Sequence, residues 1–417
     1  MPPALPRWDS SDMADSRSCD VVIIGAGIAG SALALGLSGR GLSIAVVEAQ
    51  ALTPAALPRE RDVVSFDPRV SALTPRSRAF LESLGAWEAI VDYRQCAYQH
   101  MTVWDAEGTG QVEFDCGEVD ASALGHIVEN RAILASLLEK ISTRPDIRLC
   151  AGAGLRACQR SEADALLVEL EDGALLQANL LVAADGALSA VRTLMGFETR
   201  EWDYGQRAIV ATVEVAQSHQ ATAWQRFLPG GPLALLPLPG ESGRHFCSIV
   251  WSIDDEHAEP LLALDAAEFC AELGRASEYR LGEVLTTSER FAFPLRQRHA
   301  VDYVQPGVAL VADAAHTIHP LAGQGMNLGL ADVAVLTEEI ARGLALGLPP
   351  GELALLRRYQ RQRKGDNLVM MAAMEGFKRL FAQRSPGLRW LRNAGMRRVD
   401  ALDPVKRQIM RHAMGLG

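Results

Sequence analysis

The stretch that most constrains the fold of this chain runs from Cys19 to Gln50. A run of strand-forming residues leads directly into three glycines, Gly25, Gly27 and Gly30, which have the spacing G-x-G-x-x-G. Alanine, leucine and serine then recur at helical spacing, and a second apolar run ends on Glu48. The order strand, glycine turn, helix, strand and acid is typical of a βαβ unit that binds a dinucleotide.

Each part of this unit has a physical role in holding a pyrophosphate. Gly25 permits the tight turn, Gly27 lets the backbone approach the ligand, and Gly30 lets the helix pack closely on the strand. The helix N-terminus presents unpaired N–H groups and the positive end of its dipole to the phosphates. Glu48 is placed to accept hydrogen bonds from ribose hydroxyls, and its charge would repel a 2′-phosphate, so we expect no bound NADP. The alternative is a glycine-rich βαβ unit without a ligand.

The composition of the 417-residue chain excludes several classes of protein. A formal net charge of −10 and a pI near 5.5 argue against nucleic-acid binding. The seven cysteines are scattered and never form C-x-x-C, which indicates reduced thiols in a cytoplasmic protein and no metal site. Residues 1–18 lack the apolar core of a signal peptide and are expected to be a disordered lead. No uninterrupted apolar run is long enough to span a membrane.

Local patterns predict hairpins and helices farther along the chain. Glu107-Gly108 and Asp172-Gly173 are each flanked by alternating apolar and polar residues, which predicts two hairpins. Thr74 or Ser77 is expected to cap one helix, and another helix is expected to begin near 129–131.

Several alternating segments between residues 205 and 253 predict a second, mainly antiparallel sheet, with little helix before Asp265. We therefore expect an α/β protein in which a Rossmann-like nucleotide-binding domain is interrupted by a sheet domain and followed by a helical tail. The expected ranges are 19–100, 125–200 and 295–365 for the nucleotide-binding domain, 101–124 and 201–294 for the substrate-binding sheet domain, and 366–417 for a basic amphipathic helical tail.

Two later stretches each contain a buried strand that ends on an aspartate. The strand within 180–192 ends at Asp185, and the strand within 307–336 ends at Asp313, after which a glycine-containing loop opens a helix at Met326. Asp313 is placed to accept from sugar hydroxyls, while the loop and the helix N-terminus supply backbone donors and a positive field. Such donors suit the electron-rich edge of a flavin ring, where negative charge grows on reduction.

With these three motifs in order, residues 20 to about 365 resemble the class A flavin-dependent aromatic hydroxylases typified by para-hydroxybenzoate hydroxylase. Four segments look like the branch that hydroxylates polyprenylated phenols in ubiquinone biosynthesis: RVSALTPRSRAFLESLGAW, LGHIVENRAILASLL, HTIHPLAGQGMNLGLAD and DPVKRQIMRHAMGL. The last of them is most similar to the member that adds the C5 hydroxyl. The resemblance implies an FAD-binding domain with an inserted substrate sheet. It also implies a monooxygenase that uses NAD(P)H and O₂ through a flavin C4a-hydroperoxide.

The resemblance also implies roles by position. The residues that it assigns to FAD are Gly25, Gly27, Gly30 and Glu48 for the ADP half, Arg131 for the ribityl or phosphate region, Asp185 for the flavin and a visiting nicotinamide nucleotide, Asp313 for the ribityl and pyrophosphate, and Pro320, Gly323, Gln324, Gly325, Met326 and Asn327 for the isoalloxazine. The chain departs from the family at Ala312, where a glycine usually precedes the aspartate. If that position requires a positive φ, alanine costs about 1 kcal/mol there.

Three side chains are candidates for positioning or deprotonating the phenol, namely His316, His319 and Tyr204. The alternative for each is a hydrogen bond in the core or behind the site. Substrate activation otherwise depends on the flavin, because the protein has only to exclude water and orient the ring.

The C-terminal segment carries fifteen Lys and Arg against four Asp and Glu between Arg357 and Gly417. Its apolar residues recur at helical spacing, which is typical of a basic amphipathic helix at an anionic membrane surface. A helix packed on the flavin domain with a solvated basic face explains the same pattern. A prenylated substrate favours contact with the inner face of the cytoplasmic membrane, or with other ubiquinone-biosynthesis enzymes.

Two other functions are compatible with these residues. One is a different flavin oxidoreductase on the same fold, although the W-x-W-x-I-P signature of halogenases is absent. The other is a non-catalytic scaffold or lipid-binding subunit of the ubiquinone-synthesis complex, in which Ala312 would be a sign of decay.

Overall fold

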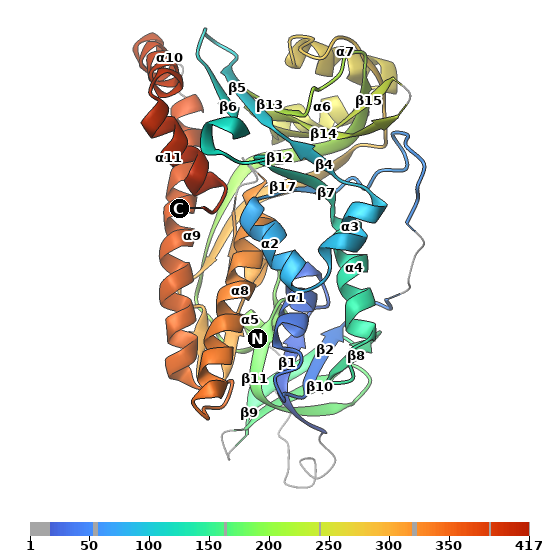
Figure 1. The fold of residues 1–417 in the computed structure, drawn as a ribbon, viewed down its shortest axis with the longest axis vertical. Helices are drawn as coiled ribbons and strands as arrows, with labels where there is room; N and C mark the ends of the chain where they lie inside the picture. Colours follow the sequence, from blue (N-terminus) through green and yellow to red (C-terminus); the bar gives the residue numbers. More distant parts are fainter. Residues whose placement is uncertain are drawn as a thin grey trace.

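The computed structural model describes residues 17–52, 57–161, 165–241, 243–318, 323–382 and 385–416 (Figure 1). These ranges contain eleven α-helices and three sheets. The predicted disordered lead lies outside them, except for Arg17 and Ser18, which begin the first strand.

The first sheet has eight strands within the described residues, in the order β18-β19-β11-β1-β2-β8, with β10 beside β11 and β9 beside β10. The strands β8, β2, β1, β11 and β19 run parallel. Residues 21–24 of β1, 44–47 of β2, 180–183 of β11 and all of β19 are buried apolar runs, as expected for parallel strands covered by helices, whereas β8 at the sheet edge is mostly exposed. The bounds are β1 (Arg17–Ile24), β2 (Ile44–Glu48), β8 (Ile147–Ala151), β9 (Leu155–Arg160), β10 (Leu166–Leu170), β11 (Leu175–Ala183), β18 (Val304–Gln305) and β19 (Val308–Leu310).

The second sheet has nine strands within the described residues, in the order β20-β17-β12-β15-β14-β13-β5-β6, with β16 beside β12. All its pairs are antiparallel except β13 with β5. The bounds are β5 (His100–Asp105), β6 (Gln111–Asp115), β12 (Thr199–Val215), β13 (Thr222–Leu228), β14 (Gly231–Glu241), β15 (Arg244–Asp254), β16 (Val284–Thr287), β17 (Phe291–Ala300) and β20 (His316–Thr317). We propose that these two sheets are the cores of the nucleotide-binding and substrate-binding domains.

A small third sheet, β3-β7-β4, lies between the two large ones (Figure 1). Its strands are β3 (Val70–Leu73), β4 (Cys96–Tyr98) and β7 (Gly125–Glu129). Leu238 and Phe246 of the second sheet pack against Ile127 of β7 and against Phe66 of the loop before β3. The third sheet therefore joins the two large sheets through apolar contacts.

Helices cover both large sheets. Residues of α1, α4 and α8 join the core of the first sheet, and residues of α6 and α7 join that of the second. The long helix α9 runs along one side of the molecule beside α8, and α10 and α11 follow it (Figure 1). The bounds are α1 (Ile28–Leu37), α2 (Pro75–Ser83), α3 (Trp87–Tyr93), α4 (Asn130–Ser142), α5 (Ala190–Leu194), α6 (Asp255–Ala263), α7 (Ala266–Ala276), α8 (Gln324–Ala345), α9 (Leu353–Ala382), α10 (Pro386–Ala401) and α11 (Asp403–Ala413).

Several local predictions are confirmed. The pairs β5–β6 and β10–β11 are antiparallel hairpins that turn where the sequence predicts. Helix α4 begins at Asn130. Thr74 caps α2 by accepting a hydrogen bond from the backbone N–H of Ser77.

Two local predictions are wrong. Helix α6 precedes Asp265, in a stretch expected to hold little helix, because acidic residues in its first turn stabilise a helix that contains Pro260. Helix α8 begins at Gln324, two residues before Met326, because the left-handed Gly323 ends the loop there. The proposed start of the tail at 366 lies within α9, whose buried Arg363 and Asn367 share one face of the helix, and the domain ranges stay a proposal.

The tail is attached to the second sheet by a buried ion pair. Arg392 of α10 lies 2.6 Å from Asp105 at the end of β5, and each side chain is 1% exposed. Asn393 donates to the same carboxylate at 2.9 Å and lies so close to Gly108 and Gly110 that a Cβ atom on either would collide with it. The β5–β6 hairpin therefore needs glycine at these positions to seat α10.

Replacing Asp105 by asparagine is expected to lower the free energy of unfolding by about 3–5 kcal/mol, because the Arg392 charge would stay buried without its partner. Urea denaturation of the full chain measures this change. Arg379→Met, in the exposed pair with Glu375, is the control and should cost less than about 1 kcal/mol. Equal losses in the two variants would contradict the buried anchor.

Candidate active site

The glycine turn after β1 is closed on one side and open on the other. Gly25 has φ +102°, and a Cβ atom there would collide with the carbonyl oxygen of Ala184. A Cβ atom on Gly30 would collide with the carbonyl of Gly25, whereas one on Gly27 would meet nothing within 4 Å. Gly27 begins α1 without a side-chain cap. The open side thus leaves room for a ligand at a helix N-terminus.

Glu48 supports this turn directly. Its Oε2 accepts a hydrogen bond from the backbone N–H of Ala26 at 2.9 Å, and its Oε1 accepts from that of Gln50 at 3.1 Å. A carboxylate keeps further lone pairs after these two bonds, so Glu48 can still accept from a ribose hydroxyl. The ribose contact expected from the sequence stays a proposal.

The strand register brings the three sequence motifs to one sheet edge. Ile24 of β1 pairs with Ala183 of β11, and Ala183 pairs with Leu310 of β19. The strands are parallel, so the residues that follow them, including Asp185 and Asp313, emerge at the same edge. Parallel α/β sheets bind ligands at this carboxyl edge.

Asp185 and Arg192 organise the turn after β11. Asp185 Oδ2 accepts from the backbone N–H of Ala190 at 2.7 Å, while its buried Oδ1 has no hydrogen-bond partner among the described residues. Arg192 donates from Nη2 to Ala187 and from Nη1 to Ala314, each at 2.8 Å. Arg192 thus ties the Asp185 turn to the Asp313 turn, a role that its position in a short apolar helix did not reveal in the sequence.

Ala312 has φ +52°, so the chain does place alanine in a left-handed conformation. Its backbone N–H donates to Asp332 Oδ2 at 3.1 Å. Gly329 of α8 faces it, and a Cβ atom on Gly329 would lie 2.8 Å from that of Ala312. The missing side chain at 329 therefore accommodates the extra one at 312.

Asp313 is exposed to solvent, yet many protein atoms surround it. Desolvation raises the pKa of its carboxyl, against the opposing charges of His316 and Arg69. The guanidinium of Arg69 also lies 5.8 Å from the ring centre of Phe293, on the second sheet. Arg69 therefore contacts the second sheet while its charge acts on the carboxyl of Asp313. Sequence reasoning missed it, since it is one of several arginines in its loop.

His316 is enclosed by the protein and is 2% exposed. Its Nε2 lies 2.5 Å from Asp332 Oδ2, and Arg363 of α9 donates to the other oxygen at 2.8 Å. Burial disfavours a charged Asp332, but these two partners lower the pKa of its carboxyl. This arrangement favours the alternative of a structural hydrogen bond for His316. His319 and Pro320 lie outside the described residues.

The first turn of α8 lies against β3. Asn327 Oδ1 accepts from the backbone N–H of Thr74 at 3.0 Å, and its Nδ2 donates to Ala72 at 2.8 Å. Gly323 caps this helix without a side-chain hydrogen bond, and a Cβ atom on Gly325 would meet nothing within 4 Å. Asn327 thus fixes the helix N-terminus, while Gly325 leaves space beside it. Gln324 and Met326 share this turn, and contacts of all five residues with a flavin stay a proposal.

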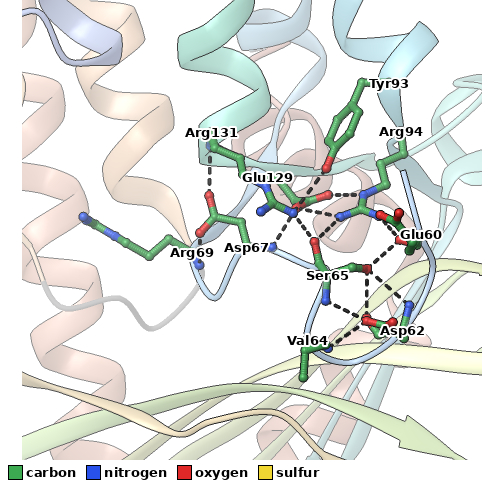
Figure 2. A network of polar contacts seen from close by, with 10 residues as sticks. All are labelled: Glu60, Asp62, Val64, Ser65, Asp67, Arg69, Tyr93, Arg94, Glu129 and Arg131. Atoms are coloured by element: carbon green, nitrogen blue, oxygen red, sulfur yellow. Dashed lines mark hydrogen bonds and ion pairs between the residues drawn. The ribbon is translucent and has the colours of Figure 1, made fainter. Parts of the chain in front are cut away.

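Tyr204 and Arg131 lie in different surroundings. The Tyr204 hydroxyl donates to Gln297, and desolvation, followed by the charge of Glu375, raises its pKa to about 12. Arg131 is paired with Glu129 and keeps a buried Nε without a partner among the described residues (Figure 2).

The arrangement fits a large polar ligand such as FAD. Two glycines leave open space at helix N-termini, and two buried polar atoms, Asp185 Oδ1 and Arg131 Nε, lack partners among the described residues. Unpaired buried polar atoms cost stability unless a ligand or water satisfies them.

Comparisons with known proteins show the family and the fold. A family model described as an FAD binding domain matches residues 18–371. The chain is 36% identical over 401 residues to 3-demethoxyubiquinol 3-hydroxylase of Escherichia coli, covering 96% of this chain and 100% of the relative. It is 38% identical over 400 residues to ubiquinone hydroxylase UbiL of Rhodospirillum rubrum, covering 96% and 90%. The solved structure of pqsL, a probable FAD-dependent monooxygenase from Pseudomonas aeruginosa, has a TM-score of 0.74 at 24% identity, covering 91% and 99%. The predicted fold class is confirmed.

Ala312 and Gly329 provide a paired test of the turn before Asp313. Ala312→Gly is expected to stabilise the protein by about 1 kcal/mol, because glycine adopts the left-handed conformation without strain. Gly329→Ala should cost roughly 1–3 kcal/mol in the natural chain, where the two Cβ atoms clash. In the Ala312→Gly background it should be neutral or favourable by up to about 1 kcal/mol, through helix propensity. Urea unfolding measures all four proteins, and an equal cost in both backgrounds would contradict this packing.

Proposed function

Because the chain belongs to the FAD binding domain family and is an FAD-dependent monooxygenase, we propose that it hydroxylates the aromatic ring of a polyprenylated phenol in ubiquinone biosynthesis. The observation that carries this proposal is the extent of the relationship. It covers 96% of this chain for two relatives named for ubiquinone chemistry, so the second sheet and the tail are included.

FAD, when bound, supplies the oxygen-activating chemistry, with electrons from NAD(P)H. The chain has to bind the flavin, orient the phenol and exclude water. We assign Gly25, Gly27, Gly30 and Glu48 to the ADP half, and Asp185 and Asp313 to the sugar and pyrophosphate. The first turn of α8 then faces the ring system, where its N–H groups stabilise negative charge.

The substrate would lie between that turn and the inner face of the second sheet. Phe293 is on this face, is 41% exposed, and lies beside Arg69 at the meeting point of the domains. Its strand register with Ala208 places it opposite the face that packs on α6 and α7. An exposed aromatic ring there suits a phenol with an apolar prenyl chain. From the resemblance of the C-terminal segment, we propose C5 as the ring carbon that is hydroxylated.

The raised pKa of Tyr204 limits its role in handling the phenol proton. With a pKa of about 12, the Tyr204 hydroxyl is neutral at physiological pH and serves as a donor instead of a base. The Nε2 of His316 is hydrogen-bonded to Asp332, so we propose His319 as the group that positions or deprotonates the substrate.

The competing functions predict different reactions. A flavin reductase on this fold would oxidise NAD(P)H without transferring oxygen. A scaffold or lipid-binding subunit would bind partners of the ubiquinone-synthesis complex without turnover. The left-handed conformation of Ala312 is no sign of a lost flavin site, because Gly329 accommodates the alanine side chain.

The full-length protein is expected to purify with bound FAD and to oxidise NAD(P)H faster when a short-chain prenylated phenol is added. Mass spectrometry should find a product heavier by one oxygen atom, and its NMR spectrum locates the new hydroxyl. An unprenylated benzoate of the same ring pattern is the control substrate and should give little product. Phenol-independent NAD(P)H oxidation without a hydroxylated product would contradict the proposal and favour a reductase.

We further propose that α10 and α11 contact an anionic membrane surface on the cytoplasmic side. No described helix is long and apolar enough to cross a membrane. Lys406, Met410 and Met414 form the buried stripe of α11, whereas Val405 and Ile409 are more than 40% exposed on another stripe. Exposed arginines accompany these apolar side chains: Arg397, Arg398, Arg407 and Arg411. Exposed apolar residues beside basic ones are typical of peripheral helices at anionic lipid.

Charge reversal on α11 tests this contact. The double variant Arg407→Glu with Arg411→Glu is expected to bind vesicles containing phosphatidylglycerol at least tenfold more weakly, since each basic residue near the surface contributes about 1 kcal/mol. Co-sedimentation with sucrose-loaded vesicles measures the affinity. Leu285→Ser, at an exposed apolar position of the second sheet, is the control and should bind normally. Unchanged binding of the double variant would assign the surface to partner enzymes instead.

A further inference from the structure

A buried carboxylate holds two arginines beside the proposed flavin site. Glu129, at the end of β7, is 2% exposed. Arg94 donates to both of its oxygens, and Arg131 Nη2 donates to Oε2 at 2.6 Å. The backbone N–H of Asp67 donates to Oε2 at 2.7 Å (Figure 2). We call Arg94, Glu129 and Arg131 the Glu129 clamp.

The clamp fixes the loop between β2 and β3. Arg94 Nη2 donates to the carbonyl of Ser65 at 2.6 Å, and Arg131 donates to the same carbonyl. Asp67 accepts from the backbone N–H groups of Arg131 and Arg69, each at 2.9 Å. The backbone of Arg69 is therefore held by the same cluster that holds Arg131 (Figure 2), and the charge of Arg69 acts on Asp313.

Arg131 is only partly satisfied by this cluster. Among the described residues, the hydrogen bonds of its guanidinium all come from Nη2, which donates to the carbonyl of Ser65, to Glu129 and to the hydroxyl of Tyr93 at 3.2 Å. Its Nε is buried without an acceptor among the described residues, although the side chain as a whole is 29% exposed. A guanidinium that is anchored by one nitrogen and has an unpaired donor on the other edge is set to receive an external acceptor.

The charge of the clamp points to an anionic acceptor. Two guanidinium groups share one carboxylate, so the cluster carries one net positive charge. The nearby carboxylates of Asp67 and Asp62 each accept hydrogen bonds from two backbone N–H groups. A phosphate or a polyol oxygen of FAD matches the free edge of Arg131 in both charge and hydrogen-bonding capacity.

We propose that Glu129, supported by Arg94, is a positioning residue that orients Arg131 and the Arg69 loop toward FAD. This inference rests on the proposed function, in which Arg131 binds the ribityl or phosphate region. Glu129 does not touch FAD itself. Its negative charge selects the rotamer of Arg131 that keeps Nε turned toward the ligand, and it prevents the two guanidinium groups from repelling each other.

The test measures FAD binding to the full-length protein after its flavin has been removed. Glu129→Gln is expected to weaken FAD binding at least tenfold and to alter the visible circular dichroism of the bound flavin. Arg131→Met should weaken binding to a similar degree. The double variant should resemble Arg131→Met alone, because both changes remove the same oriented guanidinium. Asp105→Asn, which breaks a buried ion pair in the other domain, is the control and should keep normal FAD affinity and circular dichroism.

A folded Glu129→Gln protein with FAD affinity within twofold of the natural chain, while Arg131→Met binds weakly, would overturn the inference and leave the proposed function intact. Normal affinity in Arg131→Met would instead refute the proposed role of Arg131. If Glu129→Gln fails to fold, Arg94→Lys decides. It keeps the charge but loses the paired donation to Glu129, so several-fold weaker FAD binding supports the clamp and unchanged affinity overturns it.

Discussion

The parallel register of β2, β1, β11 and β19 is the constraint on which the site depends. Val47, Ile24, Ala183 and Leu310 lie in one row across these strands. The loops that follow these strands therefore lie at the same sheet edge, although those after β11 and β19 are each more than a hundred residues farther along the chain than the one before. A one-residue slip in any pair would exchange the two faces of a strand, each of which packs against different neighbours, so the packing of the core also fixes the site.

Buried polar contacts then hold the loops in place. Arg192 joins the Asp185 and Asp313 turns, Asp332 holds the backbone of Ala312, and Glu129 holds the loop that carries Arg69. Burying such groups is costly unless each one is paired, and pairing across distant segments makes the loops rigid. The rigid loops present backbone donors to a ligand without reorganisation when it binds, which is how a protein stabilises developing charge on a bound cofactor.

The sequence was most informative where local physics determines the structure. The glycine turn, both hairpins and the Thr74 cap all follow from short-range sterics or hydrogen bonding. Predictions failed where the determinant is distant in sequence. Helix α6 forms in spite of Pro260 because, besides its acidic first turn, Leu261 packs on the second sheet.

The site shows the same division. Gly25 and Asp313 were predicted from strand ends, whereas the roles of Arg192, Glu129 and Gly329 depend on partners in other segments that no local pattern identifies. The sequence makes His316 a candidate for positioning or deprotonating the phenol. In the structure its Nε2 is hydrogen-bonded in the core to Asp332, sixteen residues later in the chain.

A crystal structure of the full chain with FAD tests the central claim most directly, namely that three separated segments bind one flavin at a single sheet edge. The account predicts the pyrophosphate beside Gly27, a sugar or phosphate oxygen within hydrogen-bond distance of Asp313, and the ring system between Gly325 and the inner face of the second sheet. A flavin bound elsewhere, or at Gly27 with Asp313 out of reach, would contradict it.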